Sequence, residues 1–454
     1  MGLITDNLNN LIQSDMYPFH MPGGKRAASL LKLDITEIEG FDDLHHPEGI
    51  IKKAMEKAAN IYGASKSFFL VNGSTAGILS AISACTKAGD EIIIARNAHR
   101  SVYNAVELMR LKPRYVIPDV MDIGCYDALS TKLAIKAIDD NPEAKVMVLT
   151  SPTYEGQVSD IEAIGRYAHE KGVILIVDEA HGAHMYFHKD FPKGALSGAD
   201  IVIQSLHKTL PALTPAAVMH IKGDRVDPKK IQKYLSIYQT SSPSYILMAC
   251  IEDVLDDAIS DERPWQRYID RLDNFYKEVS SLKNLKVLDF PGRDKGKIVL
   301  YHKNNKVSGL TLAGILRNKY HLECEYASPY FVLLMTSVMD SDEGFERLIK
   351  AIKEMDETNL DIDNVEVLFP PAKNHEMVLI PAEAAEMETE EIQYLKSEGR
   401  VSGENIYIYP PGRVYVAEGE RITKEDIEYI TYLKKTGFDI RGINNNLISV
   451  VRGL

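Results

Sequence analysis

The stretch IVIQSLHKTLP, residues 201–211, begins like a buried β-strand and ends in three chemically versatile side chains. Its first residues are branched and apolar, which favours a strand inside a sheet that is covered on both faces. Ser205, His207 and Lys208 then follow in quick succession. A lysine at a strand end ordinarily reaches into solvent, so this stretch alone indicates only a surface charge. The rest of the chain changes that interpretation.

The stretch belongs to a series, between about residues 50 and 222, in which strand-like and helix-like segments alternate. Several of the strand-like segments are apolar throughout, which predicts an α/β fold whose mainly parallel sheet has helices on both faces. In such sheets ligands bind beyond the carboxyl ends of the strands. The expected strands are residues 68–72, 91–96, 114–120, 145–152, 174–180, 201–206 and 218–223.

A chain of 454 residues exceeds what one hydrophobic core normally holds, so we expect about two or three domains. The character of the sequence changes after about residue 260, where a long charged helix leads into a mixed α+β region. The last section contains two acidic helical stretches and the turn-rich YPPGR, residues 409–413. The expected parts are an N-terminal segment (1–49), a large domain (50–260), a small α+β domain (261–360) and a C-terminal domain (361–454).

The composition excludes several classes of protein. A net charge of −13 gives no electrostatic support for a nucleic-acid or acidic-membrane partner. The four cysteines are scattered without a C-x-x-C pair, which argues against a zinc ribbon, a thioredoxin-like site or a disulfide framework. No segment is long and apolar enough to cross a bilayer. We therefore expect a soluble, cytoplasmic protein with no membrane partner.

The stretch VNGSTAG, residues 71–77, places Gly73, Ser74 and Thr75 at the start of an expected helix. Free backbone N–H groups, two hydroxyls and the positive end of the helix suit an anion, above all a phosphate. The stretch is neither a P-loop nor a G-x-G-x-x-G dinucleotide motif. An ordinary helix N-cap is the alternative interpretation.

Two further strand ends carry polar side chains. RNAHRSV (96–102) places His99 in a loop, where a single histidine is more often a bystander than a catalyst. ILIVDEAHGAH (174–184) places Asp178 at the end of a very apolar strand, where a buried carboxylate must be paired or hydrogen-bonded. His181 and His184 follow it closely. A salt bridge that closes the loop remains an alternative, whereas ligands this crowded make a metal site less favoured, and we expect none.

Together, a phosphate cradle, a buried carboxylate, an imidazole and a lysine at one sheet edge fit pyridoxal 5'-phosphate. Its aldehyde needs a lysine amine for a Schiff base, and its ring nitrogen needs an acidic partner in order to stay protonated. One helix-containing crossover is expected between Asp178 and Lys208, so adjacent strands can present both residues to one ring.

The ordered motifs resemble a known family over nearly the whole chain. They are FHMPGGKR (19–26), DITEIEGFDDLHHPEG (34–49), FFLVNGSTAG (68–77), RNAHRSV (96–102), SPTYEG (151–156), VDEAHGAH (177–184), QSLHKTLPALT (204–214), QTSSPSY (239–245) and YPPG (409–412). This set is similar to the Orn/Lys/Arg decarboxylase class-I family, which are pyridoxal-phosphate enzymes of the aspartate-aminotransferase fold (fold type I). The resemblance is to the short form of the family, without the wing domain of its large inducible members, so their decameric assembly is not assumed.

The resemblance implies a role for each matching residue. Lys208 would form the Schiff base, Asp178 would pair with the ring nitrogen, His99 would stack on the ring, and His181 would lie near the reacting carboxylate. Ser242 lies in QTSSPSY, the stretch through which a neighbouring subunit would reach the phosphate, which implies a homodimer with shared sites and leaves a higher oligomer open. The resemblance also assigns the phosphate to Ser74, Thr75, Ser205 and His207, beside Gly73.

Two positions depart from the family pattern. The family usually shows P-G-H-K near its start, whereas this chain has Gly24 in place of the histidine. An apolar residue normally follows YPPG, but here it is Arg413, which could clasp a carboxylate or lie at the surface; we favour the surface. Both changes leave the cofactor site intact and put the identity of the substrate in doubt.

The leading hypothesis is a decarboxylase of arginine, lysine or ornithine that forms a polyamine-type amine. A cationic substrate needs an anionic partner, and Glu325 in LECEYASPY (322–330) corresponds to an acidic position of the family. Glu323 lies on the same side of that expected edge strand, so one of the two could be only a solvated charge. An aminotransferase, another lyase on the same scaffold, and a cofactor-binding protein without turnover are the alternatives.

Overall fold

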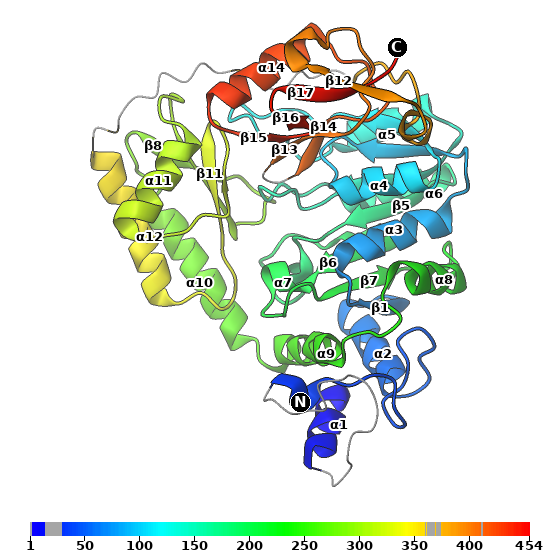
Figure 1. Ribbon diagram of the computed structural model, residues 1–454. Helices are drawn as coiled ribbons and strands as arrows, with labels where there is room; N and C mark the ends of the chain where they lie inside the picture. The colour runs from blue at the N-terminus through cyan, green and yellow to red at the C-terminus, as the bar shows by residue number, and fades with distance from the viewer. Residues whose placement is uncertain (1, 14–29, 359, 361–367, 369–373, 410–411) are drawn as a thin grey trace. The chain divides into compact units, whose positions relative to one another are not determined.

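The computed structural model describes residues 2–13, 30–358, 360, 368, 374–409 and 412–454 (Figure 1). The chain divides into two compact units. The first unit consists of residues 1–85 and 161–266, and the second consists of residues 86–160 and 267–454. Each unit is thus assembled from two separate stretches of the chain.

Four strands of the first unit lie side by side in the order β1-β7-β6-β5. The strands are β1 (Lys66–Leu70), β5 (Ile174–Asp178), β6 (Ile201–Ser205) and β7 (Ala217–Ile221). The α-helices are α1 (Leu3–Gln13), α2 (Ile50–Tyr62), α3 (Gly73–Cys85), α6 (Ile161–Glu170), α7 (Leu206–Thr209), α8 (Pro228–Tyr238) and α9 (Tyr245–Ser260). Three short 3-10 helices are η1 (Leu30–Leu33), η2 (Ala183–Tyr186) and η3 (Ala195–Ser197), and α10 (Arg263–Glu278) begins in this unit.

Strand direction in the first unit follows from the length of the connections. β5 and β6 are parallel, and Asp178 lies opposite Ile203. β7 is antiparallel to both β6 and β1, which the sequence did not predict. The segment 206–216 between β6 and β7 is too short for a parallel crossover, which takes about a dozen residues or more. The chain therefore turns back after Lys208 instead of crossing over.

Apolar residues fill the centre of this unit. Ile201, Val202 and Ile203 of β6 are all fully buried, and burying such a side chain is worth about 1.5–3 kcal/mol. Helix α3 consists largely of small residues because it lies close to the strands. A Cβ atom on Gly77 would come within 2.7 Å of the Leu70 Cδ1 atom and 3.0 Å of the Ile203 Cγ2 atom, so these fully buried side chains would have to shift.

The second unit contains three parallel strands and three smaller antiparallel sheets. The parallel strands are β2 (Glu91–Ala95), β3 (Lys112–Val116) and β4 (Ala144–Thr150), in the order β4-β2-β3. The small sheet β10-β11-β9-β8 consists of β8 (Leu285–Val287), β9 (Lys297–His302), β10 (Tyr326–Ala327) and β11 (Phe331–Met335). The helices are α4 (Arg100–Leu108), α5 (Thr131–Asp140), α11 (Gly309–Tyr320), α12 (Asp342–Glu357), α13 (Pro381–Ala385) and α14 (Lys424–Lys435), with the 3-10 helix η4 (Tyr394–Lys396).

The C-terminal part of the second unit forms two three-stranded antiparallel sheets. Their orders are β12-β17-β16 and β14-β13-β15. The strands are β12 (Thr389–Gln393), β13 (Ile406–Tyr409), β14 (Arg413–Val416), β15 (Asp439–Arg441), β16 (Ile443–Asn444) and β17 (Leu447–Val451). The sequence predicted two acidic helical stretches in this section, where α13 and α14 lie, but it missed these strands. β12 reads TEEIQ and alternates between exposed and half-buried positions, so it lacks the apolar run that marks a buried strand.

The expected α/β fold class is confirmed, with a large, mostly parallel sheet and small antiparallel sheets. Each strand expected between residues 68 and 223 is present within a few residues of its predicted bounds. The connection from β5 to β6 differs from the expectation, because residues 179–200 contain only the 3-10 helices η2 and η3. No helix in the described parts of the chain is long and apolar enough to span a bilayer. The expected four-part domain division stays a prediction.

Replacing Gly165 by alanine tests the packing of α6 in the first unit. A Cβ atom there would come within 2.1 Å of the Gly198 carbonyl oxygen, and backbone cannot easily yield. Although alanine is the better helix former by about 1 kcal/mol, we expect a net loss of about 1–3 kcal/mol and a lower thermal midpoint.

The matched control is Gly314→Ala in α11, where nothing lies within 4 Å of the added Cβ. That variant should gain about 0.5–1 kcal/mol, because alanine loses less backbone entropy than glycine on folding. A Gly165→Ala protein that unfolds at or above the parent midpoint would refute the close contact.

Candidate active site

Lys208 is held inside the first unit. It lies in the short helix α7, directly after β6, and its side chain is half-buried. Its Nζ atom lies 3.1 Å from Nε2 of His181, which follows β5 and is only 4% exposed. A half-buried lysine in contact with a buried imidazole is poorly explained as a surface charge. The pair can exchange a proton at the lysine amine.

Asp178 lies at the carboxyl end of β5, the strand next to β6. Its side chain is 4% exposed, and its Oδ1 atom accepts a hydrogen bond of 3.1 Å from the Ala180 N–H. A carboxylate can accept about four hydrogen bonds, so capacity remains for a further donor. Because β5 and β6 are parallel neighbours, Asp178 and Lys208 emerge at the same edge of the sheet. A buried carboxylate and an amine are thus available to one ligand.

Two hydroxyls meet at the start of α3. The Oγ atoms of Ser74 and Ser205 lie 2.7 Å apart although the residues are far apart in the chain. Gly73 begins the helix with a φ of 74°, a left-handed conformation that glycine adopts without strain. The first N–H groups of a helix have no partner within that helix, so they and the hydroxyls can bind an anion. Thr75, expected to join them, has an exposed side chain.

His207 is oriented by its own backbone surroundings. Its Nδ1 atom lies 3.1 Å from the Ala216 carbonyl oxygen, which can only accept, so Nδ1 carries a proton. Burial and the charge of Lys208 lower the pKa of His207, which favours the neutral ring. Its Nε2 atom is then a hydrogen-bond acceptor, and it donates to a phosphate only when the ring gains a second proton.

Ser242 is exposed in the loop that follows α8. The loop is tied to the turn between β1 and α3 of the same chain. Gln239 accepts a hydrogen bond of 2.7 Å from the Val71 N–H, and the Thr240 N–H donates to Asn72 over 3.2 Å. The turn that precedes Gly73 and the QTSSPSY loop are therefore held together, while the reach of Ser242 into a neighbouring subunit stays a prediction.

His99 belongs to the second unit, where it caps α4. Its Nδ1 atom accepts a hydrogen bond of 3.2 Å from the Ser101 N–H, so the neutral ring carries its proton on Nε2. The side chain is exposed, which leaves its faces accessible. The expected stacking of this ring on a cofactor is compatible with that exposure and stays a prediction.

Glu325 and Glu323 have different surroundings. The Tyr154 hydroxyl donates a hydrogen bond to Glu325, and the ring of Tyr154 packs edge-on against Tyr326 at 5.4 Å. Glu323 instead forms an exposed ion pair with Arg317 at 2.6 Å. Of the two acidic side chains, Glu323 therefore has the character of a solvated surface charge. Glu325 is also exposed, but an aromatic residue of the SPTYEG motif holds it.

The favoured surface position of Arg413 is wrong. Its side chain is only partly exposed, and its guanidinium lies 5.0 Å from the ring centre of Tyr126. Burial opposes the charge of Arg413, but the Glu155 carboxylate and the surrounding tyrosines together outweigh it, and the pKa of Arg413 is raised. Glu155 is 2% exposed and accepts a hydrogen bond of 2.5 Å from the Tyr326 hydroxyl. The arginine is therefore an inward-facing counter-charge.

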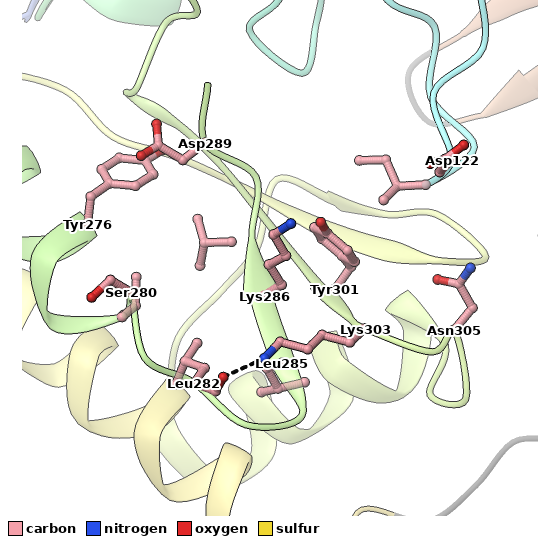
Figure 2. Close-up of a pocket in the computed structure, with 13 residues that line it drawn as sticks. Asp122, Tyr276, Ser280, Leu282, Leu285, Lys286, Asp289, Tyr301, Lys303 and Asn305 are labelled. Atoms are coloured by element: carbon pink, nitrogen blue, oxygen red, sulfur yellow. Dashed lines mark hydrogen bonds between the residues drawn. The ribbon is translucent and has the colours of Figure 1, made fainter. Parts of the chain in front are cut away.

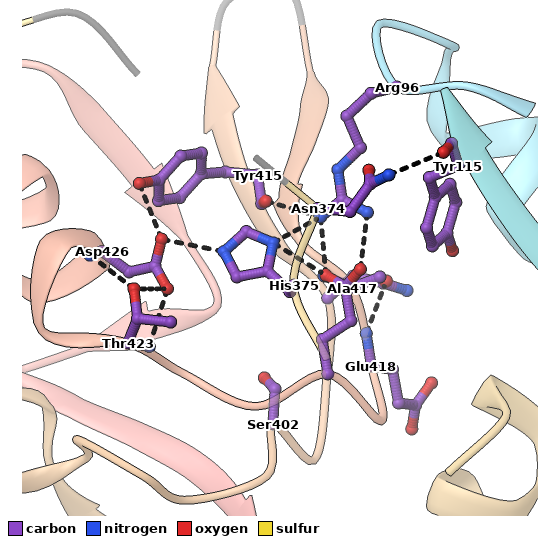
Figure 3. A network of polar contacts seen from close by, with 12 residues as sticks. Arg96, Tyr115, Asn374, His375, Ser402, Tyr415, Ala417, Glu418, Thr423 and Asp426 are labelled. Atoms are coloured by element: carbon purple, nitrogen blue, oxygen red, sulfur yellow. Dashed lines mark hydrogen bonds and ion pairs between the residues drawn. The ribbon is translucent and has the colours of Figure 1, made fainter. Parts of the chain in front are cut away.

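Sequence reasoning missed a buried network next to His99 in the chain (Figure 3). Arg96 donates to both carboxylate oxygens of Glu420, at 2.8 and 2.6 Å, and lies over the ring of Tyr115. His375 lies between two carboxylates, 3.4 Å from Glu420 and 2.9 Å from Asp426. An arginine directly after the buried strand β2 was the available signal, because such a charge needs a buried partner.

A cleft of about 620 Å³ also lies in the second unit, between α10, β8, β9 and the loop at residues 122–123 (Figure 2). Leu282, Leu285 and Val287 are among its apolar lining residues, with Lys286 and Lys303 also lining it. None of the predicted site residues lines this cleft. Among the described residues, no group of three or more histidine, cysteine or acidic side chains is arranged to hold a metal ion.

The first-unit residues fit pyridoxal phosphate by their chemistry. The Ser74–Ser205 hydroxyl pair at the start of α3 suits the phosphate, and the buried Asp178 carboxylate suits a protonated ring nitrogen. Lys208 offers the amine that the aldehyde requires. Gly24 and its P-G-G-K stretch lie outside the described residues.

Comparison with known proteins supports the resemblance. The chain is 35% identical to Uncharacterized protein YaaO of Bacillus subtilis (strain 168), over 94% of this chain and 93% of that protein. It is 29% identical to an arginine decarboxylase of the same strain, over 96% of this chain and 94% of that protein. The solved structure of the Escherichia coli constitutive lysine decarboxylase matches with a TM-score of 0.85 at 19% identity, covering 100% of this chain and 82% of that chain. At that identity the structural match supports the fold alone.

Two sequence profiles of one family match in chain order. The profile of the Orn/Lys/Arg decarboxylase major domain matches residues 24–342, and the profile of the Orn/Lys/Arg decarboxylase C-terminal domain matches residues 368–447. The first of these alone covers more than half of the chain, including every motif around Asp178 and Lys208. The chain therefore belongs to the Orn/Lys/Arg decarboxylase family.

Proposed function

We propose that this protein removes the α-carboxyl group of a basic amino acid (arginine, lysine or ornithine) with pyridoxal 5'-phosphate as its cofactor. The observation that carries the proposal is the contact of Lys208 with His181, next to the buried Asp178, at the ends of two parallel strands. Family membership adds to it, because this family contains proteins named arginine decarboxylase and lysine decarboxylase.

When bound, the cofactor supplies an aldehyde that reacts with amines and a ring that accepts the electrons left behind when carbon dioxide departs. Lys208 would provide the amine that holds the cofactor, and the same amine would free the product. Asp178 holds the proton on the ring nitrogen, which a neutral side chain could not do as well. His181 takes a proton from the Lys208 amine and returns it, since their nitrogen atoms lie 3.1 Å apart.

Ser74 and Ser205 bind the phosphate together with the first N–H groups of α3. We further propose that His99 stacks on the ring and that Ser242 reaches the phosphate of a neighbouring subunit in a homodimer. For the substrate, Glu325 is the proposed partner of the cationic side chain, since Tyr154 orients its carboxylate and an unpaired ammonium or guanidinium is costly to desolvate.

The reaction product tests the proposal. The purified protein should be loaded with pyridoxal phosphate and given arginine, lysine or ornithine, with glutamate as the control substrate. Carbon dioxide together with the matching amine supports decarboxylation. A keto acid would instead indicate an aminotransferase, and bound cofactor without any product would indicate a cofactor-binding protein that lacks turnover.

Lys208→Ala should abolish carbon dioxide release and the visible absorbance band of the tethered cofactor, because no other amine replaces it at that strand end. The matched control is Lys230→Ala, an exposed lysine of α8, which should keep both. If the Lys208→Ala protein retains the band after dialysis, a different lysine tethers the cofactor. Circular dichroism checks that both variants fold.

Glu325→Gln should raise the KM for basic amino acids and leave cofactor binding nearly unchanged. Losing one charged hydrogen bond of about 1.5–3 kcal/mol predicts a loss of about tenfold to a hundredfold in kcat/KM. Glu323→Gln is the matched control, because its parent side chain pairs with Arg317 on the surface. Equal behaviour of the two variants would place the substrate-binding charge elsewhere.

Hybrid dimers test the proposed sharing of sites. A variant with both Ser241 and Ser242 changed to alanine should retain cofactor poorly, and Lys208→Ala should be inactive. Mixing the two should restore part of the activity, because one of the two sites in each hybrid then carries neither lesion. Hybrids shown to form by mass spectrometry, yet without restored activity, would contradict shared sites.

A further inference from the structure

A chain of buried polar side chains crosses the four strands of the first unit. Ser67 of β1 lies 2.7 Å from Nδ1 of His220 of β7, and Nε2 of His220 lies 3.2 Å from Oε1 of Gln204 of β6. The Gln204 amide then donates to Oε2 of Glu179, over 2.7 Å, just beyond the end of β5. All four side chains are at most 1% exposed. The links follow the strand order β1-β7-β6-β5.

This row of hydrogen-bonded side chains lies on the face of the sheet away from the proposed active site. Successive side chains of a strand point to opposite faces. Glu179 directly follows Asp178, and Gln204 directly precedes Ser205. The ladder between the strands continues to this point, because the Glu179 N–H donates to the Ile203 carbonyl over 2.9 Å. The Glu179–Gln204 bond therefore joins the neighbour of Asp178 to the neighbour of Ser205.

The donor and the acceptor can be assigned in each hydrogen bond of this row of side chains, and the last acceptor is Glu179. The Gln204 amide nitrogen can only donate, so its oxygen accepts from the Nε2–H of His220. Burial lowers the pKa of His220 to about 3, so the ring is neutral and its Nδ1 accepts from the Ser67 hydroxyl. Glu179 also accepts from the Ala195 N–H at 2.7 Å and the Tyr186 hydroxyl at 2.9 Å. The ionised carboxylate is the acceptor that all these donors require.

We infer that Glu179 is a positioning residue of the proposed active site, which fixes Asp178 relative to Ser205 through its bond to Gln204. The inference rests on the proposed function. A slip between β5 and β6 would move the carboxylate away from the hydroxyl that binds the phosphate, and catalysis is sensitive to displacements of about 1 Å. The backbone hydrogen bonds between β5 and β6 resist this slip. The deeply buried hydrogen bond between Glu179 and Gln204 resists it further.

The same geometry makes the hydrogen bond between Glu179 and Gln204 depend on whether Glu179 is protonated. A protonated Glu179 has lost its negative charge, so the three hydrogen bonds that it accepts are no longer charge-assisted and become weaker. Burial raises the pKa of Glu179 to about 7, against the opposing effect of its hydrogen bonds, and the charge of Asp178 adds to the rise. The other titratable groups at this site are Tyr62, Tyr186 and His220. The ionised form is the competent one, so kcat should fall as the pH drops through about 7.

The test compares Glu179→Gln with Tyr186→Phe. Glutamine has nearly the same shape, but its NH₂ group must face either the Ala195 N–H or the Gln204 amide with the Tyr186 hydroxyl, so at least one donor loses its acceptor and the charge that strengthens the link to Gln204 is gone. Phenylalanine removes one donor from the same carboxylate and leaves that link in place. Two measurements are made: hydrogen–deuterium exchange of residues 174–180 and 201–206 in cofactor-free protein, and the pH profile of kcat in the loaded enzyme.

Glu179→Gln should exchange faster in both segments, lose about tenfold or more in kcat, and lose the decline of kcat below pH 7. Tyr186→Phe should keep the parent exchange pattern and the decline of kcat, but the decline should begin at a higher pH, because the lost hydrogen bond no longer lowers the pKa of Glu179. Parent-like exchange and kcat in Glu179→Gln would overturn the inference, as would equal kcat losses in the two variants that merely follow their thermal stability. Gln204→Met removes the same link from the other strand whichever way the new amide at position 179 turns, so it should give the same pattern, and it also decides the test if Glu179→Gln does not fold.

Failure of the proposed function gives a different result. A parent protein without decarboxylase activity refutes the function, while the exchange measurement still reports whether the Glu179–Gln204 link holds β5 and β6 together. A parent that is active, with Glu179→Gln unchanged in exchange and in kcat, refutes only the positioning role.

Discussion

The structure of the first unit depends on one constraint: charges at the ends of apolar strands need partners. The first three residues of β6 are apolar and fully buried, so a carboxylate or an ammonium at the end of this strand is removed from much of the solvent. Leaving such a charge unpaired costs several kcal/mol, roughly as much as a large part of a domain's net stability. Lys208 meets this constraint through its contact with His181, and Asp178 accepts a hydrogen bond from the Ala180 N–H, at the ends of neighbouring strands. The same arrangement that makes the charges tolerable makes them available for chemistry.

In the second unit, a buried arginine after β2 meets the same constraint. Arg96 is 5% exposed, and it is satisfied by a two-pronged contact with Glu420 and by the Tyr415 carbonyl. His375 extends this network to Asp426, which ties the end of β2 to the C-terminal sheets (Figure 3). The RNAHRSV motif thus has two roles. Arg96 forms a buried ion pair with Glu420, while His99 caps α4 and leaves its ring exposed.

Arg413 shows how a departure from a family pattern can be compensated nearby. The apolar residue expected after YPPG is replaced by a cation, and the buried Glu155 of the SPTYEG motif supplies the opposite charge. A change that looks like a surface substitution in the sequence therefore places a partly buried cation near a buried carboxylate. The guanidinium of Arg413 lies over the ring of Tyr126, and the hydroxyl of Tyr326 donates a hydrogen bond to Glu155.

The sequence by itself determined the fold class, the approximate bounds of the strands in the large sheet, and the polar residues at their ends. Apolar runs and the residues that directly follow them can be recognised in the sequence without knowledge of distant contacts. It did not determine the short C-terminal strands, the inward position of Arg413, or the Ser67–His220–Gln204–Glu179 hydrogen bonds. Those features join residues far apart in the chain, such as Gln204 with Glu179 or Arg96 with Glu420. Only the tertiary structure decides them, because the partner that makes a buried charge or amide tolerable is chosen by packing and strand order, and neither is visible in the local pattern.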